Sequence, residues 1–342
     1  MSLFLDSTVF RTDTIMENCP MPETAGHLWS EKDWKAGRVK TAGDPQRQFQ
    51  ENPLLILQGI RLAVTCGMSI EPVTQSAMRS QAGNLEKLDP ACLFEELSRL
   101  LPVVKKEDLQ RFAPILAAAI PELKPMIGFD QRSPHHGYDL YTHVAGVVES
   151  VPGDLALRWA ALLHDVGKVP TFTLDETGRG HFRDHAAKGA EMADAILKRL
   201  KAPDALRKQV VLLIEKHMLW LVPEKMQLRS QLGQLGLETV YQILSLQQAD
   251  NSNKGTVKSG ENEKYVRILE TLEEIRSEDG YLSLKDLAVT GDDLVRIGFS
   301  GRTIGLMLNW MLDQVQEEKL PNERGVLLGW ANHVWDEAWR NT

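Results

Sequence analysis

The sequence predicts an all-α protein with a multi-helix body, a central helical bundle and a helical tail. Apolar residues recur at helical spacing through most of the 342 residues, and no convincing alternation with period two occurs anywhere. Asp, Pro and Gly stand where many of the apolar stripes begin and end, as they do at helix boundaries. These observations favour helices throughout and leave no basis for predicting a sheet.

The first part of the chain divides at about residue 45. Residues 1–45 are the least regular, because Pro and Gly interrupt them repeatedly, and we expect no self-contained fold there. A long helical region begins at Pro45, carries the apolar run 54–64 and stops at Gly67. Shorter helices are predicted over 74–82, from Asp89-Pro90 onward and over 106–119.

The central region from about Gly128 contains further predicted helices separated by a turn and a loop. Asp154 is a good N-cap for the helix that ends at His164, and Asp184 is expected to cap the helix that starts at His185. The remaining predictions are a helix over 138–150, a loop over 170–181, a helix over 185–200, a helix from 203 past His217 to 220, and a helix over 240–249.

An adjacent His164 and Asp165 end an apolar helical run, and Gly167 then turns the chain away. Burying such a pair in a core is unfavourable unless its polar atoms have hydrogen-bond or metal partners. Neutral imidazole and carboxylate are good ligands for a divalent metal. Seven of the nine histidines lie between 135 and 217. The candidate metal ligands are His143, His164, Asp165, His185, His217 and Asp250.

Four of these candidates, His143, His164, Asp165 and Asp250, are enough for one metal centre. Asp165 has two oxygens and could bridge to a second metal held by His185 and His217. Two metals about 3.5–4 Å apart can generate a hydroxide nucleophile and hold a phosphoryl group. The donor types admit one or two ions of nickel, manganese, cobalt, iron or zinc.

Three residues are expected to contact a phosphate substrate: Lys168, His181 and Arg183. Lys168, which is also a catalytic candidate together with Asp165, is placed to meet phosphate oxygens as a cation.

Plain structural roles remain open for the same residues. A histidine at a helix end is often a capping residue. Lys168 can interact with the negative end of a helix dipole, and Asp250 can be an ordinary residue at the end of a helix. His181 can be a ligand, a substrate contact or a loop residue. The other histidines are assigned to a turn (His135, His136) or to structural roles (His27, His333).

Composition narrows the class of protein. Apolar content is 43% and charged content is 25%, as in ordinary globular proteins, and no apolar run reaches the roughly 18 residues of a membrane span. The first residues lack the basic region of a secretory signal, and the three cysteines lie far from the histidines, so we expect a cytoplasmic protein without thiolate ligands. A net charge of −8 argues against a large nucleic-acid footprint.

The order His143, His164-Asp165, Asp250 resembles the HD superfamily of metal-dependent phosphohydrolases. The run His-Asp-Val-Gly-Lys at 164–168 and the later histidines are similar to its two-metal members. This resemblance implies an HD domain over about 128–255, within the central helical bundle. It also implies hydrolysis of phosphate monoesters, 2′-nucleotides or 2′,3′-cyclic nucleotides.

A second resemblance covers nearly the whole chain from about residue 10. Residues 34–45 look like the end of the head of a bacterial tRNA nucleotidyltransferase or poly(A) polymerase, and residues 51–61 look like the start of its neck. Residues 284–305 and 320–324 are similar to its tRNA-contacting tail. The implied organisation is a head remnant over 1–45, a helical neck over 46–127, the HD domain, and a tail over 256–342.

The nucleotide-adding motifs of this family are missing or altered in the chain. No Gly-Ser nucleotide loop and no pair of metal-binding aspartates occurs, and Arg11-Thr12-Asp13 looks like a worn copy of a head motif. The base-reading motif Glu-Asp-x-x-Arg reads Glu51-Asn52-Pro53-Leu54-Leu55, and these replacements cannot hydrogen-bond a base. We therefore expect no nucleotidyl transfer by the chain alone.

The sequence thus predicts a metal-dependent HD phosphohydrolase that acts on a nucleotide or RNA-end phosphate ester. The alternative is a headless RNA-binding adaptor or subunit with a structural metal, which would bind tRNA or complement a separate head chain. Four tryptophans near the C-terminus can pack in a core or face a partner such as a second copy, with core packing favoured; they are Trp310, Trp330, Trp335 and Trp339.

Overall fold

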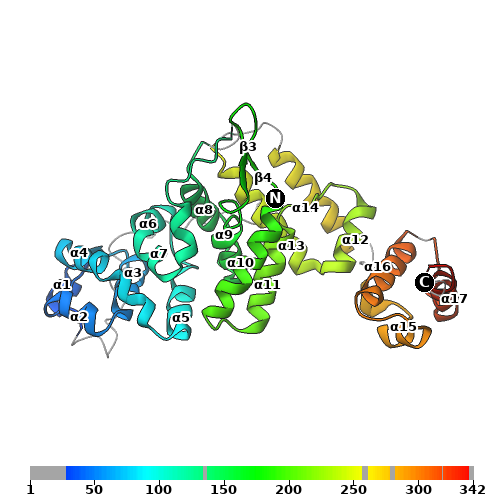
Figure 1. Ribbon diagram of the computed structural model, residues 1–342, viewed down its shortest axis with the longest axis horizontal. Coiled ribbons are helices and arrows are strands. Elements are labelled where there is room, and N and C mark those ends of the chain that lie inside the picture. Colours follow the sequence, from blue (N-terminus) through cyan, green and yellow to red (C-terminus); the bar gives the residue numbers. More distant parts are fainter. Residues whose placement is uncertain (1–27, 134–136, 256–260, 278–281, 318, 339–342) are drawn as a thin grey trace. The chain divides into compact units, whose positions relative to one another are not determined.

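Figure 1 shows the computed structural model, in which helices dominate and the only sheets within the described residues are two pairs of very short strands. The structure describes residues 28–133, 137–255, 261–277, 282–317 and 319–338. The predicted all-α class is confirmed for this part of the chain. None of its helices is long and apolar enough to cross a membrane.

The chain folds as two compact units. Among the described residues, the first unit contains those up to 217 together with 249–255, and the second contains 218–248 and those from 261 onward. Helix α13 (Leu237–Ser252) belongs to the second unit at its start and to the first unit in its last turn. The units are described separately below.

The first unit begins with elements that the sequence analysis did not anticipate. Within residues 28–45, helix α1 (Glu31–Lys35) is capped by Ser30, and strand β1 (Arg38–Val39) pairs in parallel with β2 (Ser69–Ile70). Trp29 is buried and lies close enough to Gly59 that a Cβ there would meet its ring at 2.7 Å. Tertiary contacts thus order residues 28–45, although these residues lack a periodic pattern and their strand pairs outside the segment.

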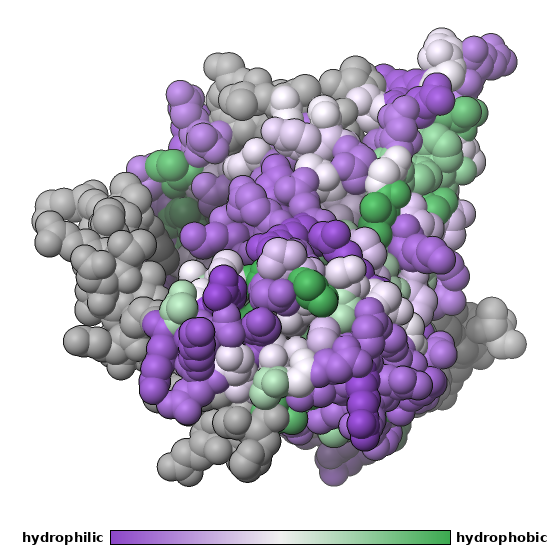
Figure 2. All heavy atoms as spheres, turned by 90° about the vertical axis from the view of Figure 1, so that its left-hand side faces the viewer, coloured by the Kyte–Doolittle hydropathy of each residue, from purple (hydrophilic) through white to green (hydrophobic). Residues whose placement is uncertain are grey.

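Short helices follow and form the body of this unit. Several begin with Pro after an acidic N-cap, since Asp44, Glu71 and Asp89 each accept a hydrogen bond from the first turn. Their bounds are α2 Pro45–Glu51, α3 Leu54–Thr65, α4 Pro72–Ser80, η2 Ala82–Lys87, α5 Pro90–Leu100, α6 Lys106–Arg111, α7 Ala113–Ala119 and η3 Pro121–Met126. The face shown in Figure 2 is mostly hydrophilic, with apolar side chains in small separate groups.

The rest of the first unit carries most of the histidines. Its elements are α8 Leu140–Ser150, α9 Leu155–Leu163, β3 Phe172–Leu174, β4 Gly180–Phe182, α10 His185–Arg199 and α11 Asp204–Lys216. Asp154 caps α9 as predicted, accepting from the amide of Leu157. His135 and His136 lie outside the described residues, as does His27.

Three predictions for this region are wrong. The expected loop over 170–181 contains the antiparallel hairpin β3–β4, whose turn Asp175 closes by accepting from the amides of Thr177 and Arg179. Asp184 adopts a left-handed backbone with φ of 60° and makes no capping hydrogen bond. Helix α11 stops at Lys216 rather than continuing to residue 220.

The second unit is held by a small apolar core that includes Leu294, Met311, Leu312 and Leu327. Its elements are α12 Lys225–Leu235, the start of α13, α14 Glu261–Ser277, η4 Leu284–Asp286, α15 Gly291–Ile297, α16 Arg302–Gln316 and α17 Arg324–Ala338. Asp293 accepts two hydrogen bonds of 2.7 Å from Arg324, which joins α15 to α17.

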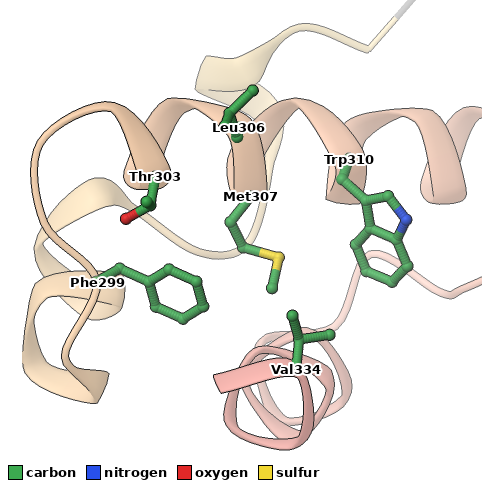
Figure 3. A pocket seen from close by; sticks show the side chains of 6 residues that line it. All are labelled: Phe299, Thr303, Leu306, Met307, Trp310 and Val334. Atoms are coloured by element: carbon green, nitrogen blue, oxygen red, sulfur yellow. The ribbon is translucent and has the colours of Figure 1, made fainter. Parts of the chain in front are cut away.

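An apolar pocket lies between α16 and α17 in this unit, with Thr303, Met307 and Trp310 on one side and Val334 on the other (Figure 3). Trp310 and Trp335 are half-buried and pack against the core of this unit, whereas Trp330 is exposed, so the prediction of core packing is wrong for Trp330. Trp339 lies outside the described residues.

Candidate metal centre

Four of the predicted ligands meet in the interior of the first unit. His143 is the fourth residue of α8, His164 is the C-cap of α9 with Asp165 directly after it, and Asp250 lies in the last turn of α13. All four are buried, with exposed fractions of 8% or less. Polar side chains that are this buried need partners, because an unsatisfied polar or charged group is costly in the interior.

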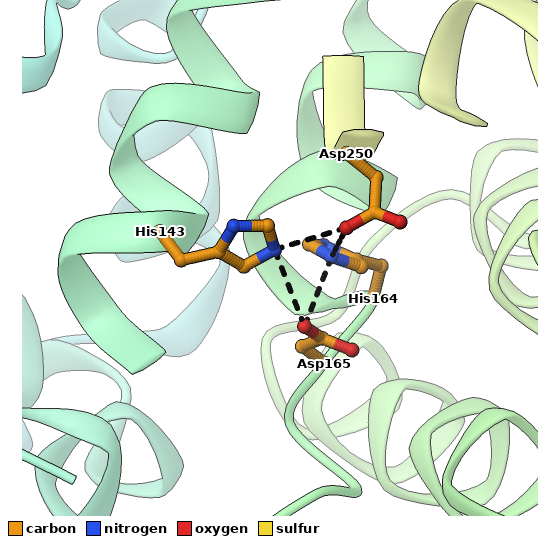
Figure 4. A group of neighbouring side chains, drawn as sticks. All are labelled: His143, His164, Asp165 and Asp250. Carbon is orange, nitrogen blue, oxygen red and sulfur yellow. Dashed lines mark ion pairs between the residues drawn. The ribbon is translucent and has the colours of Figure 1, made fainter. Parts of the chain in front are cut away.

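The donor atoms of these four side chains converge (Figure 4). His143 Nε2 lies 3.0 Å from Asp250 Oδ1 and 3.5 Å from Asp165 Oδ2. His164 Nε2 lies 3.2 Å from Asp165 Oδ2 and 3.8 Å from Asp250 Oδ1. Metal–ligand distances of about 2.1 Å imply neighbouring donors about 3.0 Å apart in an octahedral centre and about 3.4 Å apart in a tetrahedral one. The observed separations bracket these values, so the spacing suits a divalent ion.

A second group of donors shares Asp165 with the first. Its other oxygen, Oδ1, lies 3.6 Å from His185 Nε2, which lies 3.3 Å from His217 Nε2. His185 is the first residue of α10, and His217 is the C-cap of α11. The rings of His164 and His217 are 5.4 Å apart, so the two groups are contiguous. The structure therefore brings all six residues of the predicted ligand set together.

All four imidazoles are oriented by main-chain carbonyl groups. The Nδ1–O distances are 3.0 Å for His143 to Asn253, 2.9 Å for His164 to Ala161, 2.8 Å for His185 to Phe182 and 2.6 Å for His217 to Ile214. Because a carbonyl oxygen only accepts, Nδ1 carries a proton, and in the neutral imidazole Nε2 then keeps its lone pair for the cluster. This arrangement fixes the tautomer that metal-bound histidines use.

One buried ligand atom is left unsatisfied by the described residues. His164 Nε2 has no hydrogen bond of acceptable geometry, although Asp165 Oδ2, the oxygen that pairs with Lys168, lies only 3.2 Å away. Buried polar atoms are nearly always hydrogen-bonded, and an exception indicates an ion or another missing partner. A cation would accept lone pairs from both atoms at once. The residues present therefore fit a divalent metal.

The carboxylates set the electrostatics of the cluster. Burial opposes the charge of Asp165, but His164 and Lys168 outweigh burial and hold the pKa of Asp165 well below its usual range. Burial also opposes a charge on His164, yet the neighbouring Asp165 carboxylate raises the pKa of His164 to about 10. Burial lowers the pKa of His217 to about 4, so this imidazole is neutral at pH 7. Without metal, a proton on His164 partly balances the buried carboxylates.

The structure places Lys168 inside the site rather than at its mouth. Its Nζ lies 2.8 Å from Asp165 Oδ2 and donates a 3.0 Å hydrogen bond to Gln131 Oε1. The same ammonium lies 5.3 Å from the centre of the Phe182 ring. Lys168 is buried, so it balances the charge of Asp165 in the folded chain.

The other two expected substrate contacts lie on and after strand β4, away from the donor cluster. His181 Nε2 lies 2.7 Å from Asp175 Oδ2 across the β3–β4 hairpin, and the His181 side chain is partly exposed. Arg183 is exposed and lies two residues before His185. Thus neither residue belongs to the groups of converging metal donors.

Sequence reasoning missed several residues that shape the site. Gln131 holds Lys168, the Asn253 carbonyl orients His143, and Lys254 lies 2.8 Å from Asp250 Oδ2. None of these side-chain types signals a metal site by itself. The one usable signal was Gly167, where a Cβ would stand 2.3 Å from the His185 carbonyl oxygen, so the glycine permits close packing of α10.

Comparison with known proteins places this cluster in a family. Residues 141–252 match the family model of the HD domain. The chain carries an HD domain. The match runs from the start of α8 to the end of α13 and so includes all six candidate ligands. The HD domain implies binding of a divalent metal, and its identity stays open because nitrogen and oxygen donors admit several ions.

Relatives of the HD-bearing part are tRNA nucleotidyltransferases. An A-adding tRNA nucleotidyltransferase of Deinococcus radiodurans is 32% identical in an alignment of length 246 that covers 66% of this chain and 56% of that protein. A CC-adding tRNA nucleotidyltransferase of Thermus thermophilus is 33% identical over 54% of this chain and 45% of its own length. The chain thus spans about half the length of these relatives and is homologous to CCA-adding enzymes over its HD-bearing part.

The fold is similar to that of a solved relative. The crystal structure of the Bacillus stearothermophilus CCA-adding enzyme in complex with CTP superposes with a TM-score of 0.51 and 16% sequence identity. The match covers 91% of this chain and 69% of that one. At this identity the likeness concerns the fold.

Proposed function

We propose that the HD domain is a metal-dependent phosphohydrolase that acts on a nucleotide or an RNA-end phosphate ester. The observation that carries the proposal is the cluster of six side chains, in which His143, His164 and His185 direct Nε2 toward Asp165 or Asp250 and His217 Nε2 faces His185 Nε2. A bound divalent metal supplies Lewis acidity there, which activates water as a nucleophile and neutralises phosphate charge.

The protein residues have separable roles in this proposal. Asp165 offers one oxygen to each donor group and so is the catalytic carboxylate on which both depend. Lys168 keeps Asp165 ionised and supplies positive charge near the reacting phosphate. Arg183 is exposed, and among the described residues it has no ion-pair partner, so its guanidinium is available to an anionic substrate. His181, oriented by Asp175, is a further substrate contact on the same hairpin.

An RNA-end phosphate is the favoured substrate class because the relatives described above are tRNA nucleotidyltransferases. Their names describe activity on tRNA, and a phosphatase or cyclic phosphodiesterase acting on tRNA ends would suit an HD domain in that setting. The substrates to test are therefore a phosphomonoester, 2′,3′-cyclic nucleotides and RNA that ends in a cyclic phosphate.

The deciding experiment is metal analysis of the purified protein, paired with a hydrolysis screen. Nickel, manganese, cobalt and magnesium are added in turn. Asp165→Ala should lose both metal uptake and turnover, whereas Asp204→Ala, at an exposed carboxylate of α11, should keep both. Turnover that survives Asp165→Ala would exclude the proposed site, and bound metal without turnover on any substrate would favour a structural metal.

A second candidate function is an RNA-binding adaptor or subunit with a structural metal. It is favoured by the altered base-reading motif, because Leu55 stands at the position of the motif's Arg and is buried in the core. Such a side chain cannot hydrogen-bond a base. A gel shift with tRNA at two salt concentrations tests this candidate, since phosphate contacts weaken as salt rises.

A further inference from the structure

Two lysines flank the metal cluster, and they contact its two carboxylates in different ways. Lys168 Nζ lies against Asp165 Oδ2, the oxygen that also faces His143 and His164. Lys254 Nζ lies 2.8 Å from Asp250 Oδ2, whereas Asp250 faces the imidazoles with its other oxygen, Oδ1. The two oxygens of Asp250 are therefore divided between the lysine and the donor cluster.

The position of Lys254 is fixed by its neighbours. Its Nζ also donates a 2.6 Å hydrogen bond to Asn251 Oδ1, and its side chain is only 26% exposed. The carbonyl of Asn253 accepts from His143, so the same short segment orients a histidine and a carboxylate of the cluster. Asn253 fills the space over Gly146, where a Cβ would stand 2.3 Å from Asn253 Oδ1.

We propose that Lys254 is a positioning residue of the metal centre. By holding Asp250 Oδ2 it presents Oδ1 alone to the metal and keeps Asp250 from turning or from offering both oxygens. The inference rests on the metal centre of the proposed function but not on hydrolysis. Lys254 is argued to act through Asp250 and does not itself contact the reacting atoms.

Charge and orientation predict opposite effects for the loss of this lysine. An ammonium beside the centre repels a divalent cation, so removing its charge alone would strengthen metal binding. Removing an outer contact that orients a ligand instead weakens binding, typically about 10–100-fold. The sign of the change in affinity therefore distinguishes a positioning role from a purely electrostatic one.

In the test, the metal-free full chain is titrated with Co²⁺, and binding is monitored by calorimetry and by visible absorption. Lys254→Met should weaken Co²⁺ binding roughly 10-fold or more and change the absorption spectrum of the bound ion. Lys254→Arg should restore most of the affinity, because it keeps a charged donor. Asn251→Ala, which releases Lys254 without removing it, should give a smaller loss in the same direction.

Lys35→Met is the matched control, because Lys35 forms a 2.6 Å pair with Glu31 at the same spacing of four residues but on the exposed surface. It should leave Co²⁺ binding unchanged. Metal-free Lys254→Met should unfold at a lower temperature than the parent chain, because buried Asp250 loses an ion-pair partner, but its circular dichroism below the transition should match that of the parent. Equal or tighter Co²⁺ binding by Lys254→Met would overturn the inference. Since the readout is metal binding, a protein that binds Co²⁺ but hydrolyses nothing would defeat the proposed function while leaving this test intact.

Discussion

Gly167→Ala changes no ligand yet should loosen the cluster. A Cβ at this position would lie 2.3 Å from the His185 carbonyl oxygen and 2.5 Å from the Gly189 amide nitrogen. Both are main-chain atoms of α10, so no side-chain rotation relieves the overlap. The first turn of α10 must move by about 1 Å to restore a normal contact. That movement carries His185 away from Asp165, whose Oδ1 is 3.6 Å from His185 Nε2.

The cost follows from overpacking an interior contact. Inserting a methyl group into a well-packed interior destabilises a protein by about 1–3 kcal/mol. For a unit of this size, each kcal/mol lowers the thermal midpoint by about 2–4 °C, so a decrease of about 2–12 °C is expected. Affinity at the group formed by Asp165, His185 and His217 should fall more than affinity at the four-donor group.

The assay compares Gly167→Ala with Gly83→Ala, where a Cβ would meet nothing within 4 Å. Thermal unfolding is followed by circular dichroism without metal, and metal stoichiometry is measured after loading. The control should match the parent chain in both measurements. A Gly167→Ala protein with the parent's midpoint and the parent's metal content would refute the reasoning, because the observed close packing would then play no part in holding His185.

Two further predictions concern metal removal and pH. Removing the metal with a chelator should lower the thermal midpoint of the parent chain, because metal at 100 times its Kd stabilises the folded state by about 2.7 kcal/mol. The midpoint of Asp165→Ala should not change. Equal midpoints in the metal-loaded and metal-free parent chain would contradict this prediction. In the second unit, hydrogen bonds from Arg324 hold the pKa of Asp293 below its usual range. A carboxyl whose pKa is depressed in the folded state stabilises that state above its unfolded pKa of about 3.9, and this contribution is lost as the pH falls further. Urea unfolding should therefore show that the free energy of unfolding of this unit decreases below about pH 4 in the parent chain. The decrease should be smaller in Asp293→Asn.

The sequence predicted the helices and six candidate donors that lie together in the structure, but not the contacts that orient them. Helical periodicity and the helix-start residues Asp89 and Asp154 are local signals, so the all-α class followed from them. The β3–β4 hairpin was missed because its strands have three residues each, too few for an alternating pattern to appear. The adjacent His164 and Asp165 suggested a metal by their chemistry alone.

The supporting contacts could not be predicted because they join segments far apart in the chain. Gln131 reaches Lys168, and the Asn253 carbonyl reaches His143, across distances in sequence that no short motif spans. Asp184 is a residue type that often caps helices, but it lies at the junction between the hairpin and α10, where its backbone is left-handed with φ of 60°. Local propensity favoured the cap, and tertiary packing determined the backbone instead.

The orientation of the four imidazoles has a consequence for how the cluster tolerates random substitution over generations. Each Nδ1 proton is held by a peptide carbonyl, which every residue possesses, so side-chain changes at Ala161, Phe182, Ile214 or Asn253 leave those acceptors in place. The two aspartates instead depend on lysine side chains, which a single codon change removes. As random substitutions accumulate, the orientation of the two carboxylates would therefore be lost before the orientation of the four imidazoles.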